Sequence, residues 1–209
     1  MLRGPPKHFD RTDLALIEVE PRALLRLAFR ARASHLGFRT TARYRFDAPA
    51  SEFGVLYAAF DLPTAFVESL LRMVPQETPA GESPLLTYEE LARRRVVQLA
   101  ARGGGTSLRM VKLPDEGLSA AKVDNRIATI DDYTTTRLWA KAIWSHPLKA
   151  DGVVYLSRFT GARPSVVLFD RCASKDRRAR VVPLLRHPEF ASLIGQFQLS
   201  ITRPRRGRR

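Results

Sequence analysis

The chain has 209 residues, of which 44% are hydrophobic and 27% are charged, and this balance is typical of a soluble globular domain. Its one cysteine, Cys172, excludes an intrachain disulfide and a cysteine-based zinc site. No stretch approaches the roughly 20 apolar residues of a membrane span, and residues 1–20 hold no apolar segment of the secretory type. We therefore expect a cytoplasmic protein with one large domain and no membrane association.

The formal net charge is +14, and 29 of the 35 basic residues are arginine. Part of this excess lies in residues 203–209 and part in residues 171–180. Such a charge suits a solvated basic face with a basic tail, or a nucleic-acid-binding surface. No zinc-finger, helix-turn-helix or RNP-type aromatic motif supports direct nucleic-acid binding. Arginines in a cleft also suit a substrate that carries phosphates, because a guanidinium binds phosphate bidentately.

Four elements are expected in the first sixty residues. They are a loose lead-in over 1–12, a strand or short helix over 23–30, a strand over 40–48 that runs into a turn at 47–49, and a buried strand over 54–60. If residues 23–30 form a strand, alternation places Arg26 on the face opposite Leu25 and Leu27.

A helix is predicted to follow, with Asp61 as its N-cap and Pro63 in its first turn. One apolar stripe is formed by Leu62, Phe66, Leu70 and Met73. Glu68 projects roughly opposite that stripe and is surrounded by apolar residues. Because a buried, unpaired carboxylate is costly, Glu68 either has a cationic partner or has a function.

The rest of the chain adds a loop, four strands and one helix. We expect the loop over 74–88, strands over 96–100 and 108–113 joined through a turn at 103–105, a helix over 132–144, and strands over 152–156 and 165–169. The helix should bury one face, formed by Tyr133, Leu138, Trp139, Ala142 and Ile143. Because the strands and helices do not alternate regularly, the pattern predicts an α+β or mixed α/β fold with a twisted central sheet and an open cleft.

Several candidate functional residues lie near predicted strand ends or helix starts. Tyr57 and Glu68 are spaced so that a strand could deliver the first to a cleft and the next helix could bring the second over it. Each residue also has a purely structural interpretation: a tyrosine in the core, a serine at a strand end, or an arginine in a salt bridge. Arg158 suits either a ligand contact or the structural partner of Glu68.

Taken in order, these segments resemble the RES-domain family, named for its Arg, Glu and Ser. The matching segments are Arg45-Phe46, Phe53-Gly-Val-Leu-Tyr57, Ala65-Phe-Val-Glu68, Tyr133-Thr-Thr-Thr-Arg-Leu-Trp-Ala140, Asp151-Gly-Val-Val-Tyr-Leu-Ser-Arg158 and Leu168-Phe-Asp170. The resemblance covers roughly residues 23–170. The chain departs from the family pattern at Tyr44, where a glycine is usual, and at Leu27, where some members carry an aromatic residue.

The resemblance implies a toxin of a bacterial toxin–antitoxin pair with an ADP-ribosyltransferase-like fold and NAD as its substrate. It implies a cognate antitoxin with a DNA-binding domain and a toxin-binding domain. It also implies a domain division into a lead-in over 1–22, a RES domain over 23–200 and a basic, disordered tail over 201–209. Water, phosphate or a protein would accept the ADP-ribose group.

The resemblance also implies roles for individual residues. Glu68 would stabilise the oxocarbenium-like state that forms as the nicotinamide–ribose bond breaks, and Ser157 would hydrogen-bond the ribose or the carboxamide. Arg26 and Arg45 would bind the pyrophosphate, Tyr57 would stack on the nicotinamide or close its pocket, and Arg158 would contact NAD. No metal and no cofactor is expected, since NAD is the substrate.

Two other functions are compatible with the sequence. The same fold could transfer ADP-ribose to a specific protein. A basic nucleic-acid-binding or RNA-cleaving protein is the alternative from a different class, and it predicts binding that weakens steeply with salt.

Overall fold

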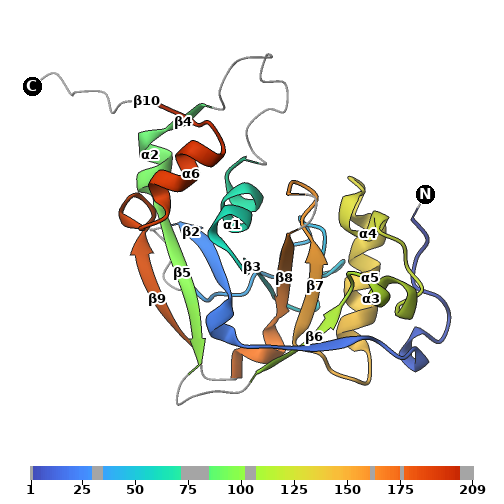
Figure 1. Ribbon diagram of the computed structural model, residues 1–209. Coiled ribbons are helices and arrows are strands. Elements are labelled where there is room, and N and C mark those ends of the chain that lie inside the picture. Colours follow the sequence, from blue (N-terminus) through green and yellow to red (C-terminus); the bar gives the residue numbers. More distant parts are fainter. Residues whose placement is uncertain are drawn as a thin grey trace, which may run out of the picture.

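The computed structural model describes residues 2–29, 35–71, 85–101, 107–160, 163–174 and 177–202. Its centre is an eight-stranded twisted sheet (Figure 1). In spatial order the strands are β1 (Leu16–Val19), β6 (Leu108–Lys112), β7 (Gly152–Leu156), β8 (Pro164–Phe169), β3 (Val55–Ala59), β2 (Leu25–Phe29), β5 (Arg94–Ala101) and β9 (Arg177–Pro183). The β6–β7 pair is parallel and the other neighbouring pairs are antiparallel. This arrangement confirms the predicted mixed α/β domain with a twisted central sheet.

Two helices carry the predicted caps. Helix α1 (Leu62–Ser69) begins where the Asp61 carboxylate accepts a hydrogen bond from the Thr64 N–H at 2.7 Å. Helix α5 (Tyr133–Ser145) is capped in the same way by Asp132. On α5 the prediction for Leu138 is wrong: its side chain is 46% exposed, because it lies about 100° around the helix from buried Trp139.

Shorter elements complete the domain. They are the helices α2 (Tyr88–Ala92), α3 (Glu116–Ala120), α4 (Arg126–Thr129) and α6 (Phe190–Gln196), the 3₁₀ turns η1 (Phe9–Arg11), η2 (Pro21–Ala23), η5 (Asp170–Ser174) and η6 (Leu184–Arg186), and a separate parallel pair, β4 (Leu85–Thr87) with β10 (Ser200–Thr202). No helix among the described residues is long and apolar enough to cross a membrane.

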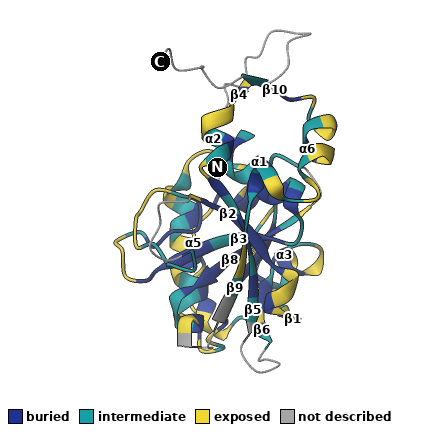
Figure 2. Ribbon diagram, turned by 90° about the vertical axis from the view of Figure 1, so that its left-hand side faces the viewer, coloured by how far each residue is buried: buried dark blue, intermediate teal, exposed yellow. Residues whose placement is uncertain are grey.

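The core is divided between the two ends of the sheet. Helix α5 packs on β3, β7 and β8 through a cluster that includes Phe53, Trp139 and Val153. Helices α1 and α6 pack on β2 and β5 through a second cluster that includes Leu27, Phe66 and Leu193. Figure 1 shows these helix groups on opposite sides of the molecule, and Figure 2 shows buried strands between them.

The central sheet divides between β2 and β3. These strands share one aligned pair, Leu25 with Ala59, whereas β3 is paired with β8 over five residues and β2 with β5 over five. Strands β2 and β3 therefore separate beyond Leu25 and Ala59. Helix α1, which follows β3 directly, lies near this fork (Figure 1).

Several predicted boundaries are corrected. Residues 1–12 were expected to be loose, but Leu2 and Phe9 are buried against α5, and β1 adds an edge strand within the expected lead-in over 1–22. The segment 40–48 is irregular and is not a strand. Residues 85–88 of the expected loop belong to β4 and the start of α2. The tail was expected from residue 201, but residues 201–202 belong to β10.

Some predictions fall outside the described residues. These are Met73, most of the loop expected over 74–88, the turn expected over 103–105, and the arginine-rich residues 203–209.

Candidate functional site

A cavity of about 410 Å³ lies at the fork between β2 and β3. This volume is within the range of small-molecule binding sites. Its lining includes five of the six predicted site residues: Arg26, Arg45, Tyr57, Glu68 and Arg158. They come from β2, the 41–47 loop, β3, α1 and the turn after β7, so the fold gathers residues that are up to 132 positions apart.

Glu68 is half-buried in the last turn of α1. Among the described residues, no donor hydrogen-bonds to its carboxylate and no cation forms an ion pair with it. Arg158, the structural partner considered for it, pairs instead with Asp131, and this hydrogen bond lowers the pKa of the Asp131 carboxyl group. In the described part of the chain, Glu68 therefore lines the cavity with a carboxylate that no side chain or backbone group engages by a hydrogen bond or ion pair.

Arg45 is 7% exposed and links the 41–47 loop to the far side of the cavity. Its Nη1 donates to the carbonyl oxygens of Ile127 at 3.1 Å and Ile130 at 2.7 Å. Its guanidinium carbon lies 4.9 Å from the centre of the Tyr133 ring. Nη2 is buried and has no hydrogen-bond partner among the described residues. Burial lowers the pKa of Arg45, and a buried donor of this kind favours binding of an anion.

Tyr57 is held by Asp47, a buried residue with 1% exposure. The Tyr57 hydroxyl donates to Asp47 Oδ1 at 3.1 Å and accepts from the Phe46 N–H at 2.9 Å. Asp47 Oδ2 accepts from the N–H groups of Arg43 at 2.9 Å and Tyr44 at 2.8 Å. These side-chain bonds to local backbone compete with strand pairing, which explains why 40–48 is a loop rather than a strand.

Helix α5 fixes the same loop from the other side. The Thr136 hydroxyl donates to the Arg45 carbonyl oxygen at 2.7 Å. Arg137 Nε donates to the Tyr44 carbonyl oxygen at 3.2 Å. The loop is therefore positioned by two elements, β3 and α5, before any ligand binds.

Ser157 is not among the cavity-lining residues. It is 1% exposed, and its hydroxyl accepts a hydrogen bond from the Phe159 N–H at 3.3 Å. Its own N–H donates to the Arg163 carbonyl oxygen at 3.0 Å. Ser157 thus stabilises the turn that carries Arg158 and Phe159, both of which line the cavity.

Three of the lining arginines were not predicted: Arg39, Arg43 and Arg94. Arg94 is buried, pairs with Glu90 and stacks on Phe29 with 3.6 Å between the guanidinium carbon and the ring centre. The arginine-rich segment 39–45 was the available signal for the first two, but it was interpreted as a strand. Arg94 had no sequence signal, because its position depends on the pairing of β5 with β2.

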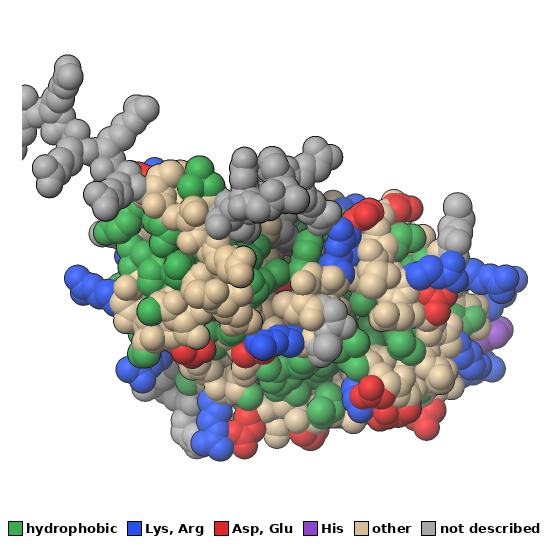
Figure 3. All heavy atoms as spheres, turned by 45° about the horizontal axis from the view of Figure 1, so that its top comes forward, with side chains coloured by type: hydrophobic (Ala, Val, Ile, Leu, Met, Phe, Trp, Pro, Cys, Tyr) green, Lys and Arg blue, Asp and Glu red, His purple; other side chains and the backbone are tan. Residues whose placement is uncertain are grey.

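The cavity is strongly basic. Six arginines and one acidic residue, Glu68, are among the lining residues. Figure 3 turns the side of the molecule that carries α1 toward the viewer and shows basic side chains near the middle of that face. Such a site suits a ligand with several negative charges and a centre that develops positive charge beside Glu68.

Comparison with known proteins agrees with this arrangement. The model of the RES domain family matches residues 21–190. The chain belongs to the RES family. One relative, "Probable toxin y4kH" of Sinorhizobium fredii (strain NBRC 101917 / NGR234), is 30% identical over 95 residues, which cover 45% of this chain and 74% of that protein.

A solved structure shares the fold of this chain. It is the crystal structure of the M. tuberculosis MbcT–MbcA toxin–antitoxin complex, which matches with a TM-score of 0.62 and 16% identity over 92% of this chain and 100% of the other. At this identity the likeness establishes the fold. The family expected from the ordered motifs is confirmed.

Proposed function

We propose that this RES protein is the toxin of a toxin–antitoxin pair and degrades NAD by cleaving the nicotinamide–ribose bond. The observation that carries the proposal is Glu68, a carboxylate that has no hydrogen-bond or ion-pair partner among the described residues and lies in a cavity whose other charged lining residues are arginines. The description of the Sinorhizobium relative as a probable toxin supports the biological role.

Glu68 supplies the electrostatic part of the mechanism. As the bond to nicotinamide breaks, the ribose gains oxocarbenium character. A carboxylate near that centre lowers the energy of the transition state more than that of the ground state. Among the described residues no hydrogen bond or ion pair engages the Glu68 carboxylate, so its oxygens are free to face the ribose. Nicotinamide already carries a positive charge in NAD and leaves as a neutral molecule, so no strong general acid is required.

Arg26 and Arg45 bind the pyrophosphate in this proposal. Arg26 is 9% exposed on β2, and Arg45 lies across the cavity with its open Nη2. A pyrophosphate oxygen would satisfy that donor. Arg158, at the start of the turn after β7, contributes further positive charge, although its pairing with Asp131 reduces its share.

Tyr57 and Ser157 have positioning roles. The Tyr57 hydroxyl is already bonded to the loop, so its ring rather than its hydroxyl is available to nicotinamide. The ring also meets Tyr44 edge-on, with 6.0 Å between ring centres. Ser157 acts through the turn that it holds, because its hydroxyl is buried away from the cavity lining.

The test is to incubate the purified protein with NAD, with and without phosphate, and to follow nicotinamide release by chromatography. Removing an electrostatic contact to the transition state typically lowers kcat by about 10²–10³-fold, and we expect at least this loss in Glu68→Gln. Glu89→Gln is the matched control, because Glu89 is an exposed acid outside the cavity. Full turnover in a folded Glu68→Gln variant would refute the mechanism.

The acceptor is identified in the same experiment. A phosphate requirement indicates phosphorolysis, and release without phosphate indicates hydrolysis. Labelled NAD added to a lysate distinguishes transfer to a protein, because label then appears on a discrete band. The antitoxin is proposed by analogy with the partner named in the MbcT–MbcA complex, and co-expression with the neighbouring gene product tests it by loss of NAD cleavage.

A further inference from the structure

The cavity holds more positive charge than the pyrophosphate of NAD requires. The pyrophosphate carries two negative charges, and in the proposed function Arg26 and Arg45 bind it and balance these charges. Arg94 and Arg158 are paired with Glu90 and Asp131. Arg39 and Arg43 remain, and in the described part of the chain neither forms an ion pair with a carboxylate. Two guanidinium groups without an ion-pair partner among the described residues therefore line the same cavity, in which Glu68 is the one acidic lining residue.

Both guanidinium groups are organised around one ring. The Arg39 guanidinium carbon lies 5.0 Å from the centre of the Tyr44 ring, and that of Arg43 lies 5.6 Å from it. These cation–π contacts orient the planar groups and offset part of the repulsion between two like charges. The aromatic residue Tyr44 stands where the family usually has glycine, so this ring is a feature of the present chain.

The backbone beneath the three residues is also fixed. The Arg39 N–H donates to the Val55 carbonyl oxygen at 2.9 Å, and the Val55 N–H donates to the Arg39 carbonyl oxygen at 2.8 Å. Asp47 holds the N–H groups of Arg43 and Tyr44. The backbone of these residues therefore loses little further conformational entropy on ligand binding, and the ordering cost that remains is that of the side chains, of which Arg43 is exposed.

We propose that Arg39, Arg43 and Tyr44 form a second anion subsite that binds a phosphate dianion other than the pyrophosphate. This inference rests on the proposed function. A phosphate group with a charge near −2 offers three oxygens, enough for two guanidinium forks. Two sources have this chemistry: the 2′-phosphate of NADP, and free inorganic phosphate beside NAD. The first makes the protein selective for NADP.

Calorimetric titration separates the two sources without requiring turnover. The ligands are ADP-ribose, ADP-ribose 2′-phosphate, and inorganic phosphate added to the ADP-ribose complex. If the phosphate is carried by the nucleotide, ADP-ribose 2′-phosphate binds about tenfold more tightly than ADP-ribose, as expected for one charge-assisted contact. If it is free, inorganic phosphate binds to the ADP-ribose complex. Either result supports the subsite only if the Arg39→Gln/Arg43→Gln double variant loses the corresponding preference for the 2′-phosphate or the corresponding binding of inorganic phosphate.

Two further variants control for charge and geometry. Arg109→Gln/Arg180→Gln removes the same charge from exposed positions on β6 and β9 and should leave both affinities unchanged. Arg39→Lys/Arg43→Lys keeps the charge without the forks and should lose part of the preference. Equal affinities for the two nucleotides, with no phosphate binding in the wild type, overturn the subsite. Failure of both nucleotides to bind overturns the proposed function instead, and phosphate binding that depends on Arg39 and Arg43 would still support the subsite.

Discussion

At the residue scale, Asp47 organises the cavity although its place in the sequence indicates only a turn. Its two carboxylate oxygens accept hydrogen bonds from the Tyr57 hydroxyl and from two backbone N–H groups of the loop. Three lining residues, Arg43, Tyr44 and Tyr57, hydrogen-bond to this carboxylate and depend on it for their positions. The chemistry assigned to the arginines therefore requires a buried acid that does not itself line the cavity.

Tyr57 makes alkaline stability a test of this network. Burial, followed by the nearby Asp47 carboxylate, raises the pKa of Tyr57 well above its ordinary value of 10.0. The folded protein thus holds the phenolic proton more tightly than the unfolded chain. This contribution to stability is complete below pH 10 and is lost as the pH rises from 10 toward the raised pKa.

We expect Tyr57→Phe to be less stable than the wild type by about 1–2 kcal/mol near neutral pH, because two hydrogen bonds are lost. The difference should shrink above pH 10, since only the wild type loses the contribution of the phenol. Urea unfolding at pH 8 and at pH 11 measures both values. Tyr88→Phe, at an exposed position on α2, is the control. A difference that stays constant with pH would contradict the assignment.

At the element scale, α1 connects the sheet to Glu68, the proposed catalytic carboxylate. It has eight residues, begins at a capped turn after β3 and carries Glu68 in its last turn. An isolated helix of this length is not stable in water. It depends on its cap and on the packing of Leu62, Phe66 and Leu70 on the sheet and α6.

Asp61→Ala removes the cap of α1 and should lower the free energy of unfolding by about 1 kcal/mol. Asp61→Asn should keep most of the stability, because asparagine caps helices about as well. Urea titration of the two variants gives the difference directly. Equal loss in both would show that the 3.3 Å ion pair between Asp61 and Arg163, rather than the cap, is the stabilising contact.

The Asp151-Gly152 motif is explained by how closely β7 packs against its neighbouring strands. A Cβ atom on Gly152 would lie 2.1 Å from the Val167 carbonyl oxygen, so only glycine allows β7 and β8 to approach at this point. Asp151 Oδ2 accepts from the Arg109 N–H at 2.8 Å and joins β7 to β6. This part of the motif is structural and sets the position of the strand that leads to Arg158.

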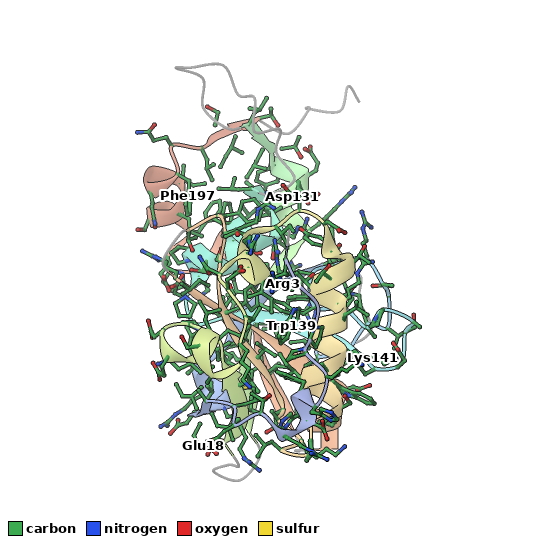
Figure 4. The ribbon with its side chains drawn as sticks, turned by 90° about the vertical axis from the view of Figure 1, so that its right-hand side faces the viewer. Arg3, Glu18, Asp131, Trp139, Lys141 and Phe197 are labelled. Atoms are coloured by element: carbon green, nitrogen blue, oxygen red, sulfur yellow. The ribbon has the colours of Figure 1, made fainter. Side chains whose placement is uncertain are left out.

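At the scale of the whole molecule, residues that precede the matched family region in the sequence complete one part of the hydrophobic core. Phe9 is 5% exposed and meets Trp139 edge-on, with 5.2 Å between ring centres. Trp139 Nε1 donates to the Arg3 carbonyl oxygen at 2.8 Å, and Figure 4 shows these two residues side by side. Residues before position 21, where the family match starts, therefore stabilise α5 and, through it, the 41–47 loop.

Phe9→Ala should lower the free energy of unfolding by about 3–5 kcal/mol, the usual range for truncation of a buried phenylalanine. Ile17→Ala, on edge strand β1 where the side chain is 39% exposed, should change it by less than about 0.5 kcal/mol. Denaturant unfolding of both proteins tests the prediction. Similar small changes in both would mean that the N-terminal segment does not contribute to the cooperative core.

The sequence by itself determined those features that depend on neighbouring residues. Strands with buried apolar runs, such as β3 and β7, and helices with a capping aspartate, α1 and α5, were predicted because periodicity and capping are local. Glu68 was identified because an acid in an apolar helix conflicts with the local pattern. The ordered motifs also identified the family.

Only the tertiary structure decided how the cavity is built. Arg45 binds carbonyl oxygens 82 and 85 positions away, and Asp47 replaces the expected strand with a loop. Ser157 is buried beside the turn that it stabilises and does not line the cavity. Arg94 lines the cavity because β5 pairs with β2. These placements depend on contacts between residues far apart in the chain, and the free energy of such contacts is not encoded in local propensity.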